Sequence, residues 1–391
     1  MSQPNSCLEL LRRMVAIDSI NQQISKRLFP ESELAEMLEA VAEGWSLRTR
    51  RMPVDDQGGY ALLITHERDP RAPWLLFESH LDTVGVEGMT IDPFELRNVD
   101  GRLTGRGACD TKGSGAAMLW ALHHYAASNA PGINVALLYS IDEETDKAGI
   151  EGFCRRHLDG LGWRPAGAIV GEPTLLLPVV AHCGVVRWTV RTHGLACHSS
   201  DPTRGRSAIR SMMRVIETLE NDYIAHLSAH HPLTGPARCS INMIVGGSAE
   251  NIIPDRCDIR VDRRVAPGED PHEVLPEIES LLDHLARRES EITYSLHDTF
   301  VDPPLAPLDD ALFYRGVQRV LAEMGLPTEL SGVGYGSDGS TLGLYGIPVV
   351  LLGPGDIAQA HSVDEWLDAS QLELAVAVYG RLMRCKAEEI A

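Results

Sequence analysis

Apolar runs of strand length recur along the chain, and each one stops at a polar or glycine-rich segment. These runs cover residues 73–77, 133–141, 166–170 and 347–352. Patterns with apolar residues three and four positions apart, which are typical of helices that face a core, cover residues 32–42, 115–125 and 309–324. Strands that alternate with helices in this way predict an α/β domain.

The segment from about residue 184 to residue 298 follows a different pattern. Its strand patterns cover residues 185–192, 239–245, 258–265 and 291–296, and its helical patterns follow Pro202 and cover residues 271–288. The order β-α-β-β-α-β is that of a ferredoxin-like unit. We therefore predict one domain from residues 1–183 and 299–391, interrupted by an α+β domain at residues 184–298. The proline-rich segment 299–307 would be the linker back to the first domain.

Residues of types that bind metal follow the strand patterns or glycine-rich connections of the first domain: His80, Asp110, Glu144, Glu172 and His361. Ligands of open α/β sheets bind beyond the carboxyl ends of the strands, so these side chains could gather at one edge. Each has an ordinary alternative, such as a surface histidine, a helix N-cap at Asp110 or a solvated acidic turn at residues 142–144. Five such alternatives would have to coincide at one edge, so the sequence favours a metal site.

Neighbouring residues suggest a division of roles within this site. His80 and Asp82 are two positions apart in extended chain, so their side chains point the same way. We expect His80 to bind metal through one ring nitrogen while the Asp82 carboxylate accepts a hydrogen bond from the other. The two oxygens of Asp110 could bridge two cations about 3.5–4 Å apart. Glu144 would bind metal, and the unligated Glu143 would take a proton from a metal-bound water as general base.

The donor set contains two histidines and three carboxylates but no thiolate. Nitrogen and oxygen donors suit Zn²⁺, which is the first candidate, and also Co²⁺ or Mn²⁺. Water bound to such a cation has a pKa near about 7, so it would supply a nucleophile at neutral pH without a covalent enzyme intermediate.

Five strings, SHLDTV, GRGACDTKG, IDEET, GEPT and QAHSVDEW, occur in this order and carry a resemblance across nearly the whole chain. They resemble the dinuclear zinc amidohydrolases that include acetylornithine deacetylase, succinyl-diaminopimelate desuccinylase, aminoacylase and carboxypeptidase G. The resemblance implies a zinc-exopeptidase-like domain with a central, mostly parallel sheet flanked by helices. It also implies that Asp110 bridges two metal ions, that His80 and Glu172 bind one of them, and that Glu144 and His361 bind the other.

The same resemblance implies that the ferredoxin-like insert is a lid or dimerisation domain. His198, in the string ACHSS, resembles the family's histidine that reaches the active site of a partner subunit and hydrogen-bonds the oxyanion. The active form would then be a homodimer. Asn251 and Arg264 match family positions that contact substrate, and Arg264 could pair with a substrate carboxylate in bidentate geometry. Ser337 is the third predicted substrate-binding residue.

Motifs that bear on specificity point in two directions. Residues 181–184, 198–205 and 352–355 resemble acetylornithine deacetylase, whereas residues 336–339 resemble the succinyl-diaminopimelate enzymes. Those desuccinylases usually have arginine where this chain has Ser340, and they carry paired arginines that are absent near Cys183. N-acetylornithine deacetylation is therefore the leading prediction, with desuccinylase or dipeptidase activity at the same site as alternatives. An inactive metal-binding scaffold is the alternative outside the enzymes, and Glu143, which metal binding does not need, argues against it.

Composition and charge limit the number of domains and the kinds of binding partner further. A chain of 391 residues with 44% hydrophobic content is long enough for two or three domains. No run reaches the roughly 18 apolar residues of a membrane span, and the first 14 residues lack the features of a signal peptide. Eight scattered cysteines fit reduced thiols in a cytoplasmic protein. A net charge of −20 argues against nucleic acid or an anionic membrane as partner, which leaves a small-molecule N-acyl amino acid as the expected one.

Overall fold

The computed structural model describes residues 2–309 and 312–390. Contacts divide the chain into two compact units. The first consists of residues 1–180, 307–331 and 337–391, and the second of residues 181–306 and 332–336. The second unit thus begins and ends near the predicted insert boundaries, 184 and 298. Its role as a lid or dimerisation domain stays a prediction.

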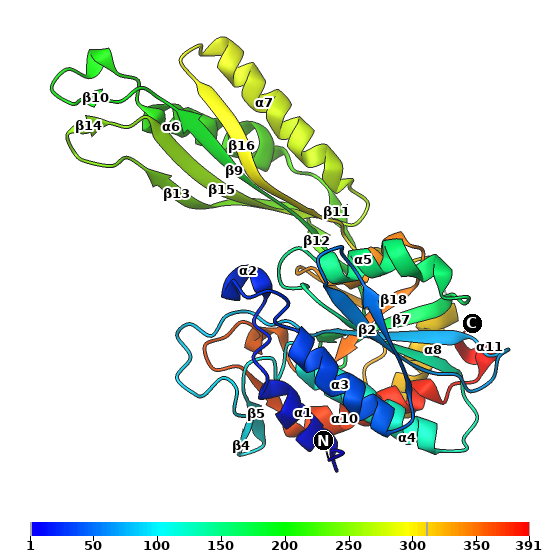
Figure 1. The fold of residues 1–391 in the computed structure, drawn as a ribbon. Coiled ribbons are helices and arrows are strands. Elements are labelled where there is room, and N and C mark those ends of the chain that lie inside the picture. Colours follow the sequence, from blue (N-terminus) through cyan, green and yellow to red (C-terminus); the bar gives the residue numbers. More distant parts are fainter. Residues whose placement is uncertain (1, 310–311, 391) are drawn as a thin grey trace. The chain divides into compact units, whose positions relative to one another are not determined.

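An eight-stranded sheet in the order β1-β2-β6-β3-β7-β18-β8-β17 forms the centre of the first unit (Figure 1). Its strands are β1 (Arg48–Pro53), β2 (Tyr60–His66), β3 (Trp74–His80), β6 (Asn134–Ser140), β7 (Pro165–Pro173), β8 (Val179–His182), β17 (Ser331–Val333) and β18 (Val349–Gly353). The four middle strands β6, β3, β7 and β18 are parallel. Strands β1, β2 and β8 pair antiparallel, and these outer strands were not predicted from the sequence.

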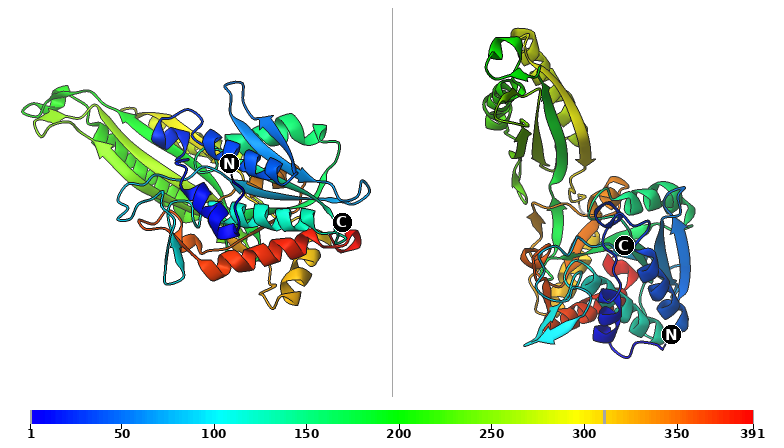
Figure 2. Two further views of the ribbon diagram at one scale, coloured as in Figure 1. Left: turned by 60° about the horizontal axis from the view of Figure 1, so that its bottom comes forward. Right: turned by 60° about the vertical axis from the view of Figure 1, so that its left-hand side comes forward.

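Helices cover both faces of this sheet, with α5 on one face and α4 and α10 side by side on the other (Figures 1 and 2). The helices of the unit are α1 (Cys7–Val15), α2 (Gln22–Ser25), α3 (Ser32–Gly44), α4 (Lys112–Ala127), α5 (Ala148–His157), α8 (Leu312–Glu323), α9 (Gly339–Leu344), α10 (Ala369–Met383) and α11 (Ala387–Ile390). Two residues of the predicted helix 309–324, Asp310 and Ala311, lie outside the described residues.

Helix α4 lies unusually close to the sheet because its first turns are built from small residues. A Cβ atom at Gly115 would come within 2.9 Å of the Tyr139 ring and within 3.0 Å of Ser79 Oγ. Any larger residue there would push the helix away from β3 and β6. The close packing matters for the site, because Asp110 lies two residues before this helix begins.

A small three-stranded sheet connects two distant parts of the first unit. It contains β4 (Arg97–Val99), β5 (Arg102–Thr104) and β19 (Trp366–Asp368), with Trp366 paired to Thr104. Glu365 directly precedes β19, and the glycine-rich loop directly follows β5. The pairing therefore brings the QAHSVDEW segment against the GRGACDTKG loop.

The second unit has the predicted order β-α-β-β-α-β, with β9 (Gly184–His193), α6 (Ala208–Thr218), β13 (Arg238–Gly246), β15 (Arg256–Val265), α7 (Val274–Arg288) and β16 (Thr293–Asp302). Its antiparallel sheet runs β13-β15-β9-β16, the strand order of a ferredoxin-like fold. Both helices pack on one face over a core that includes Trp188, Met212 and Leu282. Strand β16 continues to Asp302, so the first residues of the predicted linker are strand. Phe300 and Val301 extend the ladder by pairing with Arg187 and Val186 of β9.

Four short strands also belong to the second unit: β10 (Cys197–His198) pairs with β14 (Ile252–Ile253), and β11 (His230–His231) pairs with β12 (Gly235–Pro236). Within residues 2–309 and 312–390, the structure contains no helix with the length and apolar character needed to cross a membrane.

Candidate metal centre

The five predicted metal ligands come from loops and strand ends at one edge of the large sheet. His80 is the last residue of β3, Glu144 follows β6 and Glu172 lies near the end of β7. Because β6, β3 and β7 are adjacent and parallel, their carboxyl ends meet. Asp110 precedes α4, and His361 follows the connection that leaves β18.

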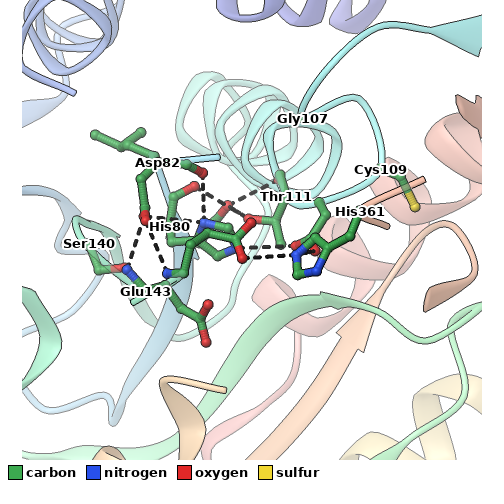
Figure 3. A network of polar contacts seen from close by, with 12 residues as sticks. His80, Asp82, Gly107, Cys109, Thr111, Ser140, Glu143 and His361 are labelled. Atoms are coloured by element: carbon green, nitrogen blue, oxygen red, sulfur yellow. Dashed lines mark hydrogen bonds and ion pairs between the residues drawn. The ribbon is translucent and has the colours of Figure 1, made fainter. Parts of the chain in front are cut away.

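These side chains form two groups that share Asp110. His80, Asp110 and Glu172 form one group, and Asp110, Glu144 and His361 form the other; within each, the ligand atoms lie within 4.8 Å of one another. His80 Nε2 is 3.2 Å from Asp110 Oδ1, whereas His361 Nε2 is 3.4 Å from Asp110 Oδ2. Each oxygen of Asp110 therefore faces a different histidine, as a bridging ligand requires. Figure 3 shows the rings of His80 and His361 among these contacts.

Electrostatics at the centre fit a pair of cations. Burial raises the pKa of Glu172 well above its usual value, and the nearby Asp110 raises it further. Burial alone would lower the pKa of His80, but its contacts with Asp110 and Asp82 raise it well above the ordinary value. The hydrogen bond with Glu144 raises the pKa of His361 to about 9. Closely spaced carboxylates thus demand positive charge, which protonated imidazoles or divalent cations would supply.

One buried carboxylate oxygen without a partner in the described part of the chain also indicates that a cation fits this site. Glu144 Oε1 is buried and has no hydrogen-bond partner among the described residues, while Oε2 lies 2.9 Å from His361 Nε2. A buried carboxylate oxygen without a partner is costly, and a bound cation would satisfy it. The nitrogen and oxygen donors of the two groups suit zinc, cobalt or manganese, so the residues present fit a pair of such ions.

Asp82 contacts His80 differently from the prediction. Nδ1 of His80 lies 3.0 Å from the backbone oxygen of Asp82 and 3.4 Å from its Oδ1, so the carbonyl is the closer partner. The carboxylate accepts hydrogen bonds from the backbone N–H groups of Glu143 and Glu144, each at 3.0 Å, and from Asn21 Nδ2 at 2.9 Å. Asp82 therefore orders the turn that carries Glu143 and Glu144 as well as the His80 ring.

Glu143 lies beside the ligand groups but belongs to neither of them. Its side chain is largely buried, and burial raises its pKa to about 8 even though Lys147 acts in the opposite direction. Lys147 Nζ lies 4.0 Å from Glu143 Oε1 and donates a hydrogen bond to the Ser337 carbonyl at 2.7 Å. A carboxylate with a proton affinity in this range is suited to accept and return a proton near neutral pH.

Of the three residues of the second unit that were predicted to contact substrate, His198 and Asn251 lie together, and Arg264 lies near the other end of β15. His198 is exposed on β10 and faces Ile252 of β14 in register, while the Asn251 carbonyl accepts a hydrogen bond from Ser199 N–H at 2.9 Å. Strand β14 ends just before β15 begins at Arg256. Arg264 lies eight residues beyond Arg256 on β15, which is roughly 26 Å along the strand at about 3.3 Å per residue.

A sequence model of peptidase family M20/M25/M40 matches residues 76–384. The chain belongs to this family. It is 33% identical to an acetylornithine deacetylase of Myxococcus xanthus over 314 residues, which cover 78% of each chain. Membership of the M20 family and the similarity to this deacetylase show that the chain is a metal-dependent amidohydrolase.

Solved structures show the same M20 fold. An M20 family metallo-carboxypeptidase of Sulfolobus solfataricus superposes with a TM-score of 0.78 at 18% identity and covers 97% of this chain and 99% of its own. A Bacillus subtilis protein described as a dinuclear metal binding peptidase of the M20 family gives a TM-score of 0.70 at 16% identity, with 97% of this chain and 96% of its own covered. At these identities the likeness concerns the fold.

Beyond the residues predicted from its M20 motifs, the chain contains a buried acid pair that the sequence reading missed. Glu78 is buried, its Oε1 accepts a hydrogen bond from Ser140 Oγ at 2.6 Å, and burial raises its pKa to about 7. Burial, and then the proximity of Glu78, raise the pKa of Asp338 well above its usual value. The signals of this pair in the sequence were a carboxyl residue directly after the apolar run 73–77 and an aspartate in the segment 336–339.

Ser337, the predicted substrate-binding residue of the first unit, belongs to this buried region. Its side chain has no exposed area, and its hydroxyl accepts a hydrogen bond from Gly339 N–H at 3.2 Å. The Ser337 carbonyl binds Lys147, as described above, so the loop supports the residues around Glu143. Direct contact of Ser337 with substrate stays a prediction.

The raised pKa values predict how stability depends on pH. Burial raises the pKa of Glu31 to about 8, that of Glu78 to about 7 and that of Glu143 to about 8, all from 4.5. The folded chain thus holds protons that the unfolded chain releases, and the resulting stabilisation is present below pH 4.5 and lost as the pH rises through 7 to 8. We expect protein stripped of metal by a chelator to show a lower Tm at pH 7 than at pH 6, measured by calorimetry.

Zinc should raise the Tm more at pH 7 than at pH 6, because protons compete with the cations less at the higher pH. Glu31→Gln is a control that removes one of these carboxyls, so it should make the pH dependence shallower. Burial lowers the pKa of Lys112 to about 7, so this one group acts in the opposite direction as the pH approaches and passes 7, against three carboxyl groups. A Tm of the stripped protein that rises between pH 6 and pH 7 would contradict the assignment of these protons.

Proposed function

We propose that this chain hydrolyses the amide bond of an N-acyl amino acid, with N-acetylornithine as the first candidate substrate. The observation that carries the proposal is the pair of ligand groups joined by Asp110, with Glu143 beside them and in neither group. A relative that is 33% identical is an acetylornithine deacetylase, which supports this choice among acylated amino acids.

Two divalent cations, with zinc as the first candidate and cobalt or manganese as alternatives, would be held by this chain's own side chains. Asp110 would bind both ions, while the remaining ligands are His80 and Glu172 for one ion and Glu144 and His361 for the other. Such ions lower the pKa of water from 15.7 to about 7 and polarise a carbonyl group.

Glu143 is the proposed general base and later the general acid. Its carboxylate would accept a proton from the attacking water and return it to the nitrogen of the departing amino acid. Lys147 lies 4.0 Å away and favours the ionised carboxylate, whereas burial favours the protonated one. Their balance supports a group that changes protonation state during each turnover. Asp82 holds the backbone of this turn through the N–H groups of Glu143 and Glu144.

We also infer that substrate recognition involves two copies of the chain. His198 and Asn251 lie together next to the start of β15, whereas Arg264 lies at its far end. Three residues separated in this way cannot all touch one small acyl amino acid from a single copy of the unit. A homodimer in which His198 reaches the partner's centre would let residues from two copies contact one substrate.

Removal of the general base tests the reaction. We expect Glu143→Gln to lower kcat for N-acetylornithine by about 10²- to 10⁴-fold, because proton transfer is lost while the metal ligands remain. Steady-state kinetics and metal analysis of the same samples would check this, and both proteins should contain two ions per chain.

Glu33→Gln, at an exposed position on α3, is the matched control and should retain wild-type kcat. Full activity of Glu143→Gln with two bound ions would show that Glu143 is not the base. Absence of hydrolysis in wild-type protein that holds two ions, across all acylated amino acids, would instead favour a metal-binding scaffold.

A substrate panel tests the specificity. N-acetylornithine, N-acetylcitrulline, succinyl-diaminopimelate and simple dipeptides should be compared by kcat/KM with the zinc-loaded enzyme. We expect the highest value for N-acetylornithine. The loop at residues 336–339, which resembles desuccinylases, is the feature that keeps succinyl-diaminopimelate in the panel. A preference for dipeptides would replace the deacetylase proposal with an exopeptidase.

The dimer proposal has its own test. Mixing inactive Glu143→Gln protein with inactive His198→Ala protein should restore part of the activity, because each mixed dimer then carries one complete centre. Sedimentation should detect the dimer under the same conditions. A fully active monomer, stable on dilution, would refute the sharing of His198.

A further inference from the structure

Glu365 makes an unusual set of hydrogen bonds with the loop that carries Asp110. Its side chain is 1% exposed. Oε1 accepts hydrogen bonds from the N–H groups of Cys109 at 2.7 Å and Asp110 at 3.0 Å. Oε2 accepts from the N–H of Gly107 at 3.0 Å and from Arg106 Nη1 at 2.8 Å. One carboxylate thus receives four donors from within five consecutive residues.

Further contacts join this loop to the segment that carries His361. Arg106 Nη2 donates a hydrogen bond to the Ser362 carbonyl at 3.3 Å, and Gly105 N–H donates to the Glu365 carbonyl at 3.1 Å. Directly beyond Glu365, Trp366 pairs with Thr104. The two segments are more than 250 residues apart in sequence, yet they are connected on both sides of the Glu365 carboxylate.

The direction of these bonds explains why a carboxylate is needed. Buried N–H groups that precede a helix have no partner within it and must find acceptors elsewhere. Glu365 offers two oxygens with several lone pairs, and Arg106 balances its charge. Glutamine has one acceptor oxygen and an NH₂ group, so in either orientation it would place donors against donors.

Position matters here because Asp110 is the residue shared by both ligand groups. Its two oxygens face His80 Nε2 at 3.2 Å and His361 Nε2 at 3.4 Å, so a small rotation of its backbone would spoil both contacts. The His361 side chain is 54% exposed and receives little support from packing. Bonds between its segment and the Asp110 loop are therefore a main restraint on the distance between these ligands.

We propose that Glu365 is a positioning residue for the metal centre: with Arg106 it clamps the Asp110 loop to the His361 segment and so sets the geometry of both ion sites. This inference rests on the proposed metal centre. In this proposal Glu365 contacts neither metal nor substrate. Its effect is on the affinity of the centre for metal, before any reaction takes place.

The test measures zinc affinity without substrate. Wild type, Glu365→Gln and Glu365→Asp would be stripped of metal and titrated with zinc in competition with a chromogenic chelator. Partners that orient metal ligands typically contribute about 10- to 100-fold in affinity. We expect a loss of this size at both sites in Glu365→Gln and a smaller loss in Glu365→Asp, which keeps the charge but has a shorter reach.

Hydrogen exchange of the metal-free proteins provides the second readout. In Glu365→Gln, the amides of Gly107, Cys109 and Asp110 should exchange faster than in wild type, while the amides of β6 stay protected. Glu269→Gln is the matched control, because Glu269 likewise pairs with an arginine, Arg263, and accepts a backbone N–H, that of Ala266 at 2.7 Å, but belongs to the second unit. Its zinc affinity should stay within about twofold of wild type.

Should Glu365→Gln fail to fold, Arg106→Lys replaces it, because lysine keeps the charge but cannot contact Glu365 and Ser362 together. A folded Glu365→Gln or Arg106→Lys protein that binds both zinc ions within about twofold of wild type would overturn the inference. Wild type that bound two zinc ions but hydrolysed no acyl amino acid would contradict only the proposed function. Wild type that bound no zinc would overturn both.

Discussion

Carboxylates packed closely in a buried site repel one another and lose their hydration, so positive charge has to be supplied between them. Asp110, Glu144 and Glu172 face this constraint at the edge of the large sheet. The protein places the two imidazoles of His80 and His361 against them, and their raised pKa values show how strongly the site attracts positive charge. Two divalent cations would neutralise the same carboxylates with four positive charges, two in each ligand group. The donor types, the shared Asp110 and the unpaired oxygen of Glu144 are consequences of that requirement.

Neutralising the charge does not by itself fix the positions of the ligand side chains. The structure fixes them at two places with the same kind of contact. Asp82 and Glu365 are buried carboxylates that accept several backbone N–H groups from a loop that carries a ligand. Asp82 orders the turn of Glu143 and Glu144, and Glu365 orders the loop of Asp110. Backbone held in this way leaves the ligand side chains little freedom, which lowers the entropy lost when metal binds. Both carboxylates therefore act through their neighbours.

Strand periodicity and strand ends were enough to predict that the five candidate ligands gather at one edge of the sheet, and to predict the ferredoxin-like order. These features depend on local sequence and on the parallel arrangement of a few strands; the roles of the five residues and of Glu143 stay predictions. Other parts of the site depend on contacts that local patterns do not contain. Asn21 reaches Asp82 across 61 residues, and Arg106 reaches Glu365 across 259. Strand β1 was missed because it is largely exposed and polar, so it lacks the apolar run of a buried strand. The closer contact of His80 with a backbone carbonyl follows from the turn after β3, which side-chain spacing cannot reveal.

Buried groups that metal binding does not require are the strongest structural argument for catalysis over a scaffold. Glu143 belongs to neither ligand group, and its burial raises its pKa to about 8, which is a cost to the folded state at neutral pH. A protein that only held two ions would be more stable with an apolar residue there. Glu78 and Asp338 add a buried acid pair close to Glu143 and Lys147. Unfavourable burial of acidic groups of this kind concentrates at sites of catalysis. This cost has a purpose if Glu143 exchanges a proton in every turnover, because a carboxylate held in water, with an ordinary pKa, would be a weaker base towards the attacking water.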